Sequence, residues 1–258
     1  MSLALDFYVP GDTWLHRLDP RVKLWGAVVV SVAAFTWFSI PAQIVLLIGL
    51  HLLLLGNRVP WSRARRLWRQ MAVLLILIVV LQPLFAPSGQ TLVALGPLRL
   101  TTGGLLNGFL FAVRAMVIVF VMGTLLFTTD QRALVRAFVR LGLPYTWGLT
   151  FSLTLRFLPT IQHLFTAVRE AQAARGWVAE GNIVRRFREY LPVLVAVIIG
   201  TLQMSDRLTL ALAARGMATT SERTVWRDLQ MRPADWLVLI ALTLAFGALL
   251  WWRFTIAR

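Results

Sequence analysis

Apolar and polar positions follow one another along this chain in long blocks. Five blocks of about 16 to 20 residues contain almost no charge, and a bilayer core of about 30 Å is crossed by a helix of about 20 residues. The blocks cover residues 22–39, 41–56, 71–86, 108–127 and 235–252. We therefore predict about five transmembrane helices, with a Pro-, Gly- and Thr-rich segment over residues 87–107 on the outside.

Two further segments are longer and of mixed polarity. Residues 145–175 are apolar at first and then charged, and residues 183–215 contain an apolar run of only 12 residues, from Leu191 to Leu202. That run is shorter than a membrane span requires. We interpret both segments as long helices packed under or partly into the membrane. The alternative is a pair of ordinary spans that carry Arg156 and Asp206.

The composition agrees with a membrane protein. Hydrophobic residues make up 58% of the chain and charged residues only 14%, against about 25% charged residues in an average soluble domain. The fold class predicted is an all-α integral membrane protein, with about five spans and a cytoplasmic block of long helices. Cysteine is absent, which excludes disulfides and cysteine metal sites.

Arginines indicate the orientation. Residues 57–70 hold five arginines and no acid between two predicted spans, so this loop and the N-terminus are predicted to be cytoplasmic. A nucleic-acid-binding arm is a weaker interpretation of the same residues and of the net charge of +15. We divide the chain into a membrane region of four spans over 1–127, a cytoplasmic or interfacial region over 128–234 and a last span within 235–258.

One tetrapeptide occurs twice, each time at the end of a long segment. Ala173-Ala174-Arg175-Gly176 is followed by Ala213-Ala214-Arg215-Gly216. Alanine favours a helix, a glycine just after a helix end accepts the left-handed conformation, and a cation suits the C-terminal end of the helix dipole. One copy alone indicates only a helix stop. Two copies in corresponding positions indicate two helices that each present one arginine.

The sequence holds no set of catalytic residues that we recognise. The single lysine, Lys23, has no preceding glycine loop, so a phosphate-binding loop is excluded. The three histidines are scattered, and we predict no metal site, no cofactor and no enzymatic activity. His51 is interpreted as a packed helix histidine, and Arg114 as a cation that snorkels outward or pairs inside the bundle. Energy for any transport would then come from another subunit docked from the cytoplasm.

These motifs resemble a known family. Ala174-Arg175-Gly176 and Ala214-Arg215-Gly216, with the opening stretch Leu15-His16-Arg17-Leu18-Asp19-Pro20-Arg21-Val22-Lys23, are similar to the transmembrane (T) component of energy-coupling factor transporters. These are ABC-type importers for vitamins and transition-metal ions in the prokaryotic plasma membrane. The resemblance implies partners: two ABC ATPases, identical or different, and a small membrane protein that binds substrate, the S component. It also implies that the docking residues are Ala174, Arg175, Gly176, Ala214, Arg215 and Gly216.

Two other classes of function are compatible with an apolar helical chain. A self-contained channel or secondary carrier would use residues 145–215 as extra spans and would transport without an ATPase. An intramembrane enzyme is disfavoured because no catalytic set is present. The transported substrate is not encoded in any motif of this chain, since the resemblance assigns substrate choice to the S component.

Overall fold

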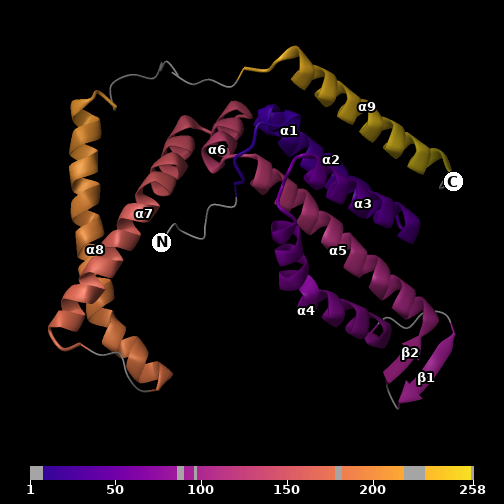
Figure 1. The fold of residues 1–258 in the computed structure, drawn as a ribbon, viewed down its shortest axis with the longest axis horizontal. Coiled ribbons are helices and arrows are strands. Elements are labelled where there is room, and N and C mark those ends of the chain that lie inside the picture. The colour runs from indigo at the N-terminus through magenta and orange to yellow at the C-terminus, as the bar shows by residue number, and fades with distance from the viewer. Residues whose placement is uncertain (1–7, 86–89, 96–97, 178–181, 218–229, 257–258) are drawn as a thin grey trace. The chain divides into compact units, whose positions relative to one another are not determined.

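The computed structural model describes residues 8–85, 90–95, 98–177, 182–217 and 230–256. They separate into two compact units, and each is described by itself (Figure 1). One unit is built from residues 142–228, and the other from residues 4–141 together with residues 229–258. We refer to them as the two-helix unit and the bundle unit.

The bundle unit is organised around one long helix, α5 (Thr102–Thr128). Its elements are α1 (Trp14–Arg17), α2 (Pro20–Thr36), α3 (Ile40–Gly56), α4 (Trp61–Phe85), β1 (Thr91–Leu95), β2 (Leu98–Thr101), α5, α6 (Gln131–Arg140) and α9 (Pro233–Ile256). Helices α2, α3 and α4 all pack against α5. Met116, Val117 and Phe120 on α5 are at most 1% exposed, so the core of this unit lies along the middle of α5.

The segment before α5 differs from its prediction. The predicted span over residues 108–127 begins six residues earlier, at Thr102, and the strands β1 and β2 before it pair in antiparallel fashion. The side-chain oxygen of Thr101 accepts a hydrogen bond from the backbone N–H of Gly104 at 3.3 Å. A threonine cap of this kind satisfies one free N–H at the start of a helix. Thr101 therefore begins the helix in a stretch whose glycines disfavour helix by propensity alone.

Helices α4 and α5 approach closely where α5 carries glycines four residues apart. A Cβ atom at Gly104 would lie 2.7 Å from the Cα of Pro83, and one at Gly108 would lie 3.3 Å from the Cα of Val79. Residues four apart share one helix face, and small residues there allow backbones to approach in membrane helix pairs. The spacing of Gly104 and Gly108 thus sets the contact between α4 and α5.

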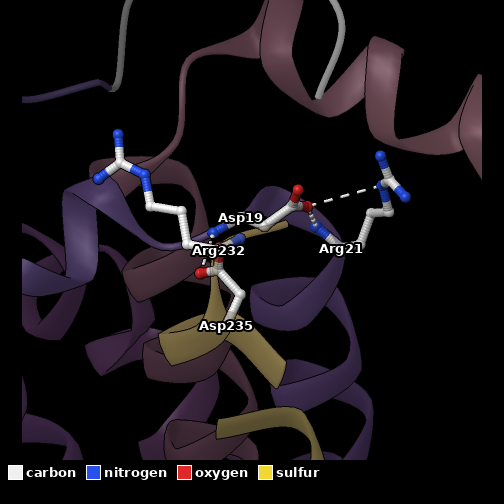
Figure 2. Close-up of polar contacts among 4 residues, drawn as sticks. All are labelled: Asp19, Arg21, Arg232 and Asp235. Carbon is white, nitrogen blue, oxygen red and sulfur yellow. Dashed lines mark hydrogen bonds and ion pairs between the residues drawn. The ribbon is translucent and has the colours of Figure 1, made fainter. Parts of the chain in front are cut away.

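The first residues of α2 and α9 are joined by carboxylates (Figure 2). Asp19 caps α2: its Oδ1 accepts from the N–H of Arg21 at 2.9 Å. Asp235 accepts from two backbone N–H groups, that of Asp19 at 3.0 Å and that of Arg232 at 2.7 Å. Asp19 and Arg232 are the residues just before the two helices, so one buried carboxylate serves both N-termini, where the helix dipoles favour negative charge.

Lys23 makes a complementary contact with the end of α5. Its Nζ donates to the carbonyl oxygen of Thr128 at 2.9 Å and to the hydroxyl of Thr129 at 3.3 Å. The last carbonyls of a helix lack partners within the helix, and a cation there is favoured by the dipole. Helix α2 is therefore tied to α9 through Asp19 and to α5 through Lys23.

Three helices in the described part of the chain are long and apolar enough to cross a membrane. They are Thr102–Thr128, Phe187–Ala214 and Pro233–Arg253, and Ile40–Gly56 is a shorter apolar helix. The fold is that of an all-α membrane protein with one small hairpin. The segment Phe187–Ala214 lies within the second long helix of the two-helix unit.

Candidate docking site

Both copies of the tetrapeptide lie in the two-helix unit. Its helices are α7 (Tyr145–Ala174) and α8 (Ile183–Ala214), which confirms the predicted long helices over 145–175 and 183–215. Each helix continues through its internal proline, Pro159 in α7 and Pro192 in α8. The two helices run in opposite directions and cross, so their C-terminal ends lie at opposite ends of the pair (Figure 1).

The two helices end in the same backbone motif. In α7 the N–H of Gly176 donates to the carbonyl of Ala173 at 2.9 Å, and that of Trp177 to the carbonyl of Gln172 at 3.0 Å. In α8 Gly216 donates to Ala213 at 2.9 Å and Met217 to Leu212 at 3.1 Å. This pair of bonds defines the Schellman motif, which needs a left-handed residue after the cap.

The glycines adopt the conformation that this motif requires. Gly176 has a φ of 82° and Gly216 a φ of 71°, a region that other residues enter at a cost. A Cβ atom built on Gly176 would meet no atom within 4 Å. Within the described residues, the backbone conformation therefore requires glycine at this position, and close packing does not. The helix-stop interpretation is confirmed for both copies, and the arginines occupy the same position in both.

The arginine side chains at these ends are exposed. Arg175 and Arg215 are both exposed, as are the alanines before them. Within the described residues neither guanidinium has a hydrogen bond or an ion pair, and the motif uses only backbone groups. Each end thus offers a planar, five-donor cation of the kind that forms forked bonds to carboxylates or carbonyls.

The distance between the two ends follows from the helix contacts. Gly200 of α8 packs against the side chain of Leu164 of α7. Arg175 lies 11 residues beyond Leu164 and Arg215 lies 15 residues beyond Gly200, in opposite directions from the crossing. The two stretches of helix between these contacts and the arginines have a summed length of about 39 Å at 1.5 Å per residue. One two-helix unit can therefore present its two arginines to sites that are tens of ångströms apart.

Trp177 holds the end of α7 against α8, a contact that the sequence analysis did not anticipate. Its ring meets that of Tyr190 edge to face, with centroids 5.0 Å apart, and its Nε1 donates to the carbonyl of Glu189 at 2.8 Å. Aromatic pairs of this geometry stabilise a contact by about 0.5–1.5 kcal/mol beyond area burial. The sequence signal that could have indicated this contact is the aromatic residue directly after Gly176. The C-terminal end of α7 is thereby positioned by α8.

His51 and Arg114 have structural environments. His51 donates from Nδ1 to the carbonyl of Leu47 at 2.8 Å, accepts at Nε2 from Trp68 at 3.1 Å and stacks on Phe120, which confirms a packed histidine. Arg114 pairs inside the bundle, where its Nη2 donates to the carbonyl of Trp37 at 3.4 Å. No group of three or more potential metal ligands lies in the described part of the chain.

Comparison with known proteins identifies the family of this chain. The CbiQ family model, described as a cobalt transport protein, matches residues 11–226. The energy-coupling factor transporter transmembrane protein EcfT of Streptococcus equi is 30% identical over 248 residues, which cover 93% of this chain and 92% of the relative. This chain belongs to the family of energy-coupling factor transporter transmembrane proteins. The EcfT protein of Listeria innocua is likewise 30% identical, with 98% of each chain covered.

One relative of this transmembrane-protein family is much longer than the chain. A putative ABC transporter ATP-binding protein of Bifidobacterium longum is 32% identical over 253 residues, which cover 93% of this chain but only 32% of the relative. In that protein a segment similar to 93% of this chain is part of a polypeptide named for ATP binding. As a member of the energy-coupling factor family, the chain is a membrane-embedded transporter subunit.

Proposed function

We propose that this chain is the energy-transducing subunit of an ABC-type importer and that its two Ala-Arg-Gly ends dock onto two ABC ATPases. The observation that carries the proposal is the repeated helix end: Arg175 and Arg215 stand in identical backbone motifs, exposed and without partners in the described residues. Two equivalent ends suit two equivalent or related ATPases. The Bifidobacterium relative named for ATP binding supports an ATPase as the partner.

Each residue of the docking set has a proposed role. Arg175 and Arg215 would form charge-assisted bonds to acidic or carbonyl groups in a groove of each ATPase. Ala174 and Ala214 are small and Gly176 and Gly216 have no side chain, so a groove wall could approach the helix end closely. ATP hydrolysis belongs to the partners, and this chain would be non-catalytic.

Motion of the two ends would reach the membrane through the apolar face of α8. Six residues between Leu191 and Leu202 fall on one face of the helix and are between 39% and 61% exposed: Leu191, Leu194, Val195, Ile198, Ile199 and Leu202. An exposed apolar strip of this length is suited to an apolar partner. We propose that it contacts the S component, which would select a vitamin or a transition-metal ion.

The proposal includes an orientation. Residues 1–127 and 235–258 would anchor the chain in a prokaryotic plasma membrane, residues 128–234 would form the coupling region, and the N-terminus would be cytoplasmic. Between residues 128 and 234 there are 14 arginines and 7 acids, an excess of arginine typical of the cytoplasmic side. The docking ends would then face the compartment that contains ATP.

The test is capture of partners by the tagged chain from its native membrane, with mass spectrometry of the retained proteins. Wild-type chain is expected to retain ABC ATPase and a small membrane protein. Arg175→Ala and Arg215→Ala should each weaken ATPase retention, because loss of one buried charge-assisted contact costs about 2–5 kcal/mol. Arg169→Ala and Arg207→Ala are matched controls, since both arginines are exposed on the same helices away from the ends.

Two results would contradict the proposal. Equal ATPase retention by the end variants and the controls would show that Arg175 and Arg215 are ordinary helix ends. A chain that is purified without an ATPase and still transports would instead support a self-contained carrier in which α8 crosses the membrane.

A further inference from the structure

Helix α4 begins with a cluster of arginines that the docking proposal does not use. Arg63, Arg65, Arg66 and Arg69 lie in its first nine residues, and residues 57–85 contain no acid. Arg65, Arg66 and Arg69 are exposed. Within the described part of the chain none of these three guanidinium groups has an ion pair or a hydrogen bond. Three neighbouring cations without counter-charges repel one another, so an external anion is favoured there.

The three arginines share one face of α4 with an exposed apolar strip. At 100° per residue, Arg65, Arg66 and Arg69 fall in the same arc of about 100° as three apolar residues further along the helix. These are Val73, Ile76 and Val80, which are 77%, 65% and 51% exposed. The cluster and the strip therefore form one continuous surface, charged at its start and apolar along the rest.

The opposite face of α4 packs into the bundle. Ala64 is 4% exposed, and Leu67, Met71 and Leu75 pack against the core cluster that contains Phe120. The charged and apolar surface is thus the side of α4 that faces away from its own bundle. In the orientation proposed above, on which this step rests, residues 1–127 anchor the chain in the membrane, and an exposed apolar side of a helix there faces lipid.

The distances place the arginines at the level of lipid headgroups. Arg69 precedes Val73 by one turn, about 6 Å along the helix, and Arg65 precedes it by about 12 Å. Trp61 lies one turn before Arg65 and is 52% exposed, as is typical of side chains at a membrane interface.

We propose that Arg65, Arg66 and Arg69 form a binding surface for the phosphate groups of anionic phospholipids, whose acyl chains lie along Val73, Ile76 and Val80. The guanidinium fork matches two phosphate oxygens, and clustered arginines next to a membrane helix attract anionic lipids. This surface is separate from the two Ala-Arg-Gly ends, and its existence does not depend on ATPase docking.

The test is native mass spectrometry of the purified full chain, titrated in detergent with phosphatidylglycerol or with phosphatidylcholine. The wild-type chain is expected to prefer phosphatidylglycerol by tenfold or more, since each arginine near an anionic headgroup contributes about fivefold in binding. The variant R65Q/R66Q/R69Q should lose most of this preference. The matched control R65K/R66K/R69K keeps the charge and should retain a clear preference.

Each outcome of the titration bears on the proposal. An undiminished preference for phosphatidylglycerol in the glutamine variant would overturn it. If the triple variant does not fold, Arg66→Gln alone should lower phosphatidylglycerol binding about fivefold, and no change would overturn the proposal equally.

Discussion

Replacing Asp235 by alanine removes the one carboxylate that serves the first residues of two helices. Asp235 is 3% exposed, and it accepts from the backbone N–H groups of Asp19 and Arg232 at 3.0 and 2.7 Å. Asp19 lies directly before α2, and Arg232 lies directly before α9. The bond between Asp19 and Asp235 joins residues that are 216 positions apart in the sequence. The substitution should therefore weaken the attachment of α9 to the rest of the bundle unit.

The expected loss follows from the two donors. A buried N–H group left without an acceptor costs about 1–3 kcal/mol, so Asp235→Ala should lower the free energy of unfolding by about 4 kcal/mol. For a chain of this length that corresponds to a fall in Tm of about 8–16 °C. Asp235→Asn fills the same space and keeps one acceptor oxygen, so it should lose roughly half as much.

The assay is thermal unfolding of the purified protein in detergent, followed by tryptophan fluorescence. Asp206→Ala is the control, because Asp206 is exposed on α8 and its loss should change the free energy of unfolding by less than about 0.5 kcal/mol. The reasoning would be refuted if Asp235→Ala lowered Tm no more than the control. It would also be refuted if the asparagine variant were less stable than the alanine variant.

Two further substitutions test particular glycines. Gly104→Ala should lower the free energy of unfolding by about 1–3 kcal/mol, because the new Cβ meets the Pro83 backbone at 2.7 Å. Gly49→Ala is the control, since no atom lies within 4 Å of its Cβ. In the same thermal assay it should be neutral or stabilising. Gly176→Ala should strain the left-handed residue at the end of α7 by about 1 kcal/mol. The backbone amide of Trp177 should then exchange hydrogen faster than in the wild-type chain. Asparagine tolerates this conformation, so in Gly176→Asn the same amide should exchange at nearly the wild-type rate. Equal exchange rates of the Trp177 amide in both Gly176 variants would contradict the assignment of a left-handed residue at Gly176.

The sequence by itself determined the features that depend on residues within about four positions of one another. The ends of α7 and α8 were predicted to within one residue, because alanine, glycine and the backbone bonds of a helix end are local. The start of α5 was predicted six residues too late, since a local glycine-rich composition concealed the Thr101 cap. The repeat indicated that Arg175 and Arg215 are presented at two helix ends. Their docking role was implied by the family resemblance and stays a prediction.

Only the tertiary structure decided which distant groups meet. Nothing near Asp235 in the sequence indicates that it accepts a bond from Asp19, and nothing near Trp177 indicates that it packs on Tyr190. Arg114 could have pointed outward, and it pairs with Trp37 because α2 ends beside it. The physical reason is common to all three: a buried polar or aromatic group needs a partner, and packing of helices far apart in the chain selects that partner.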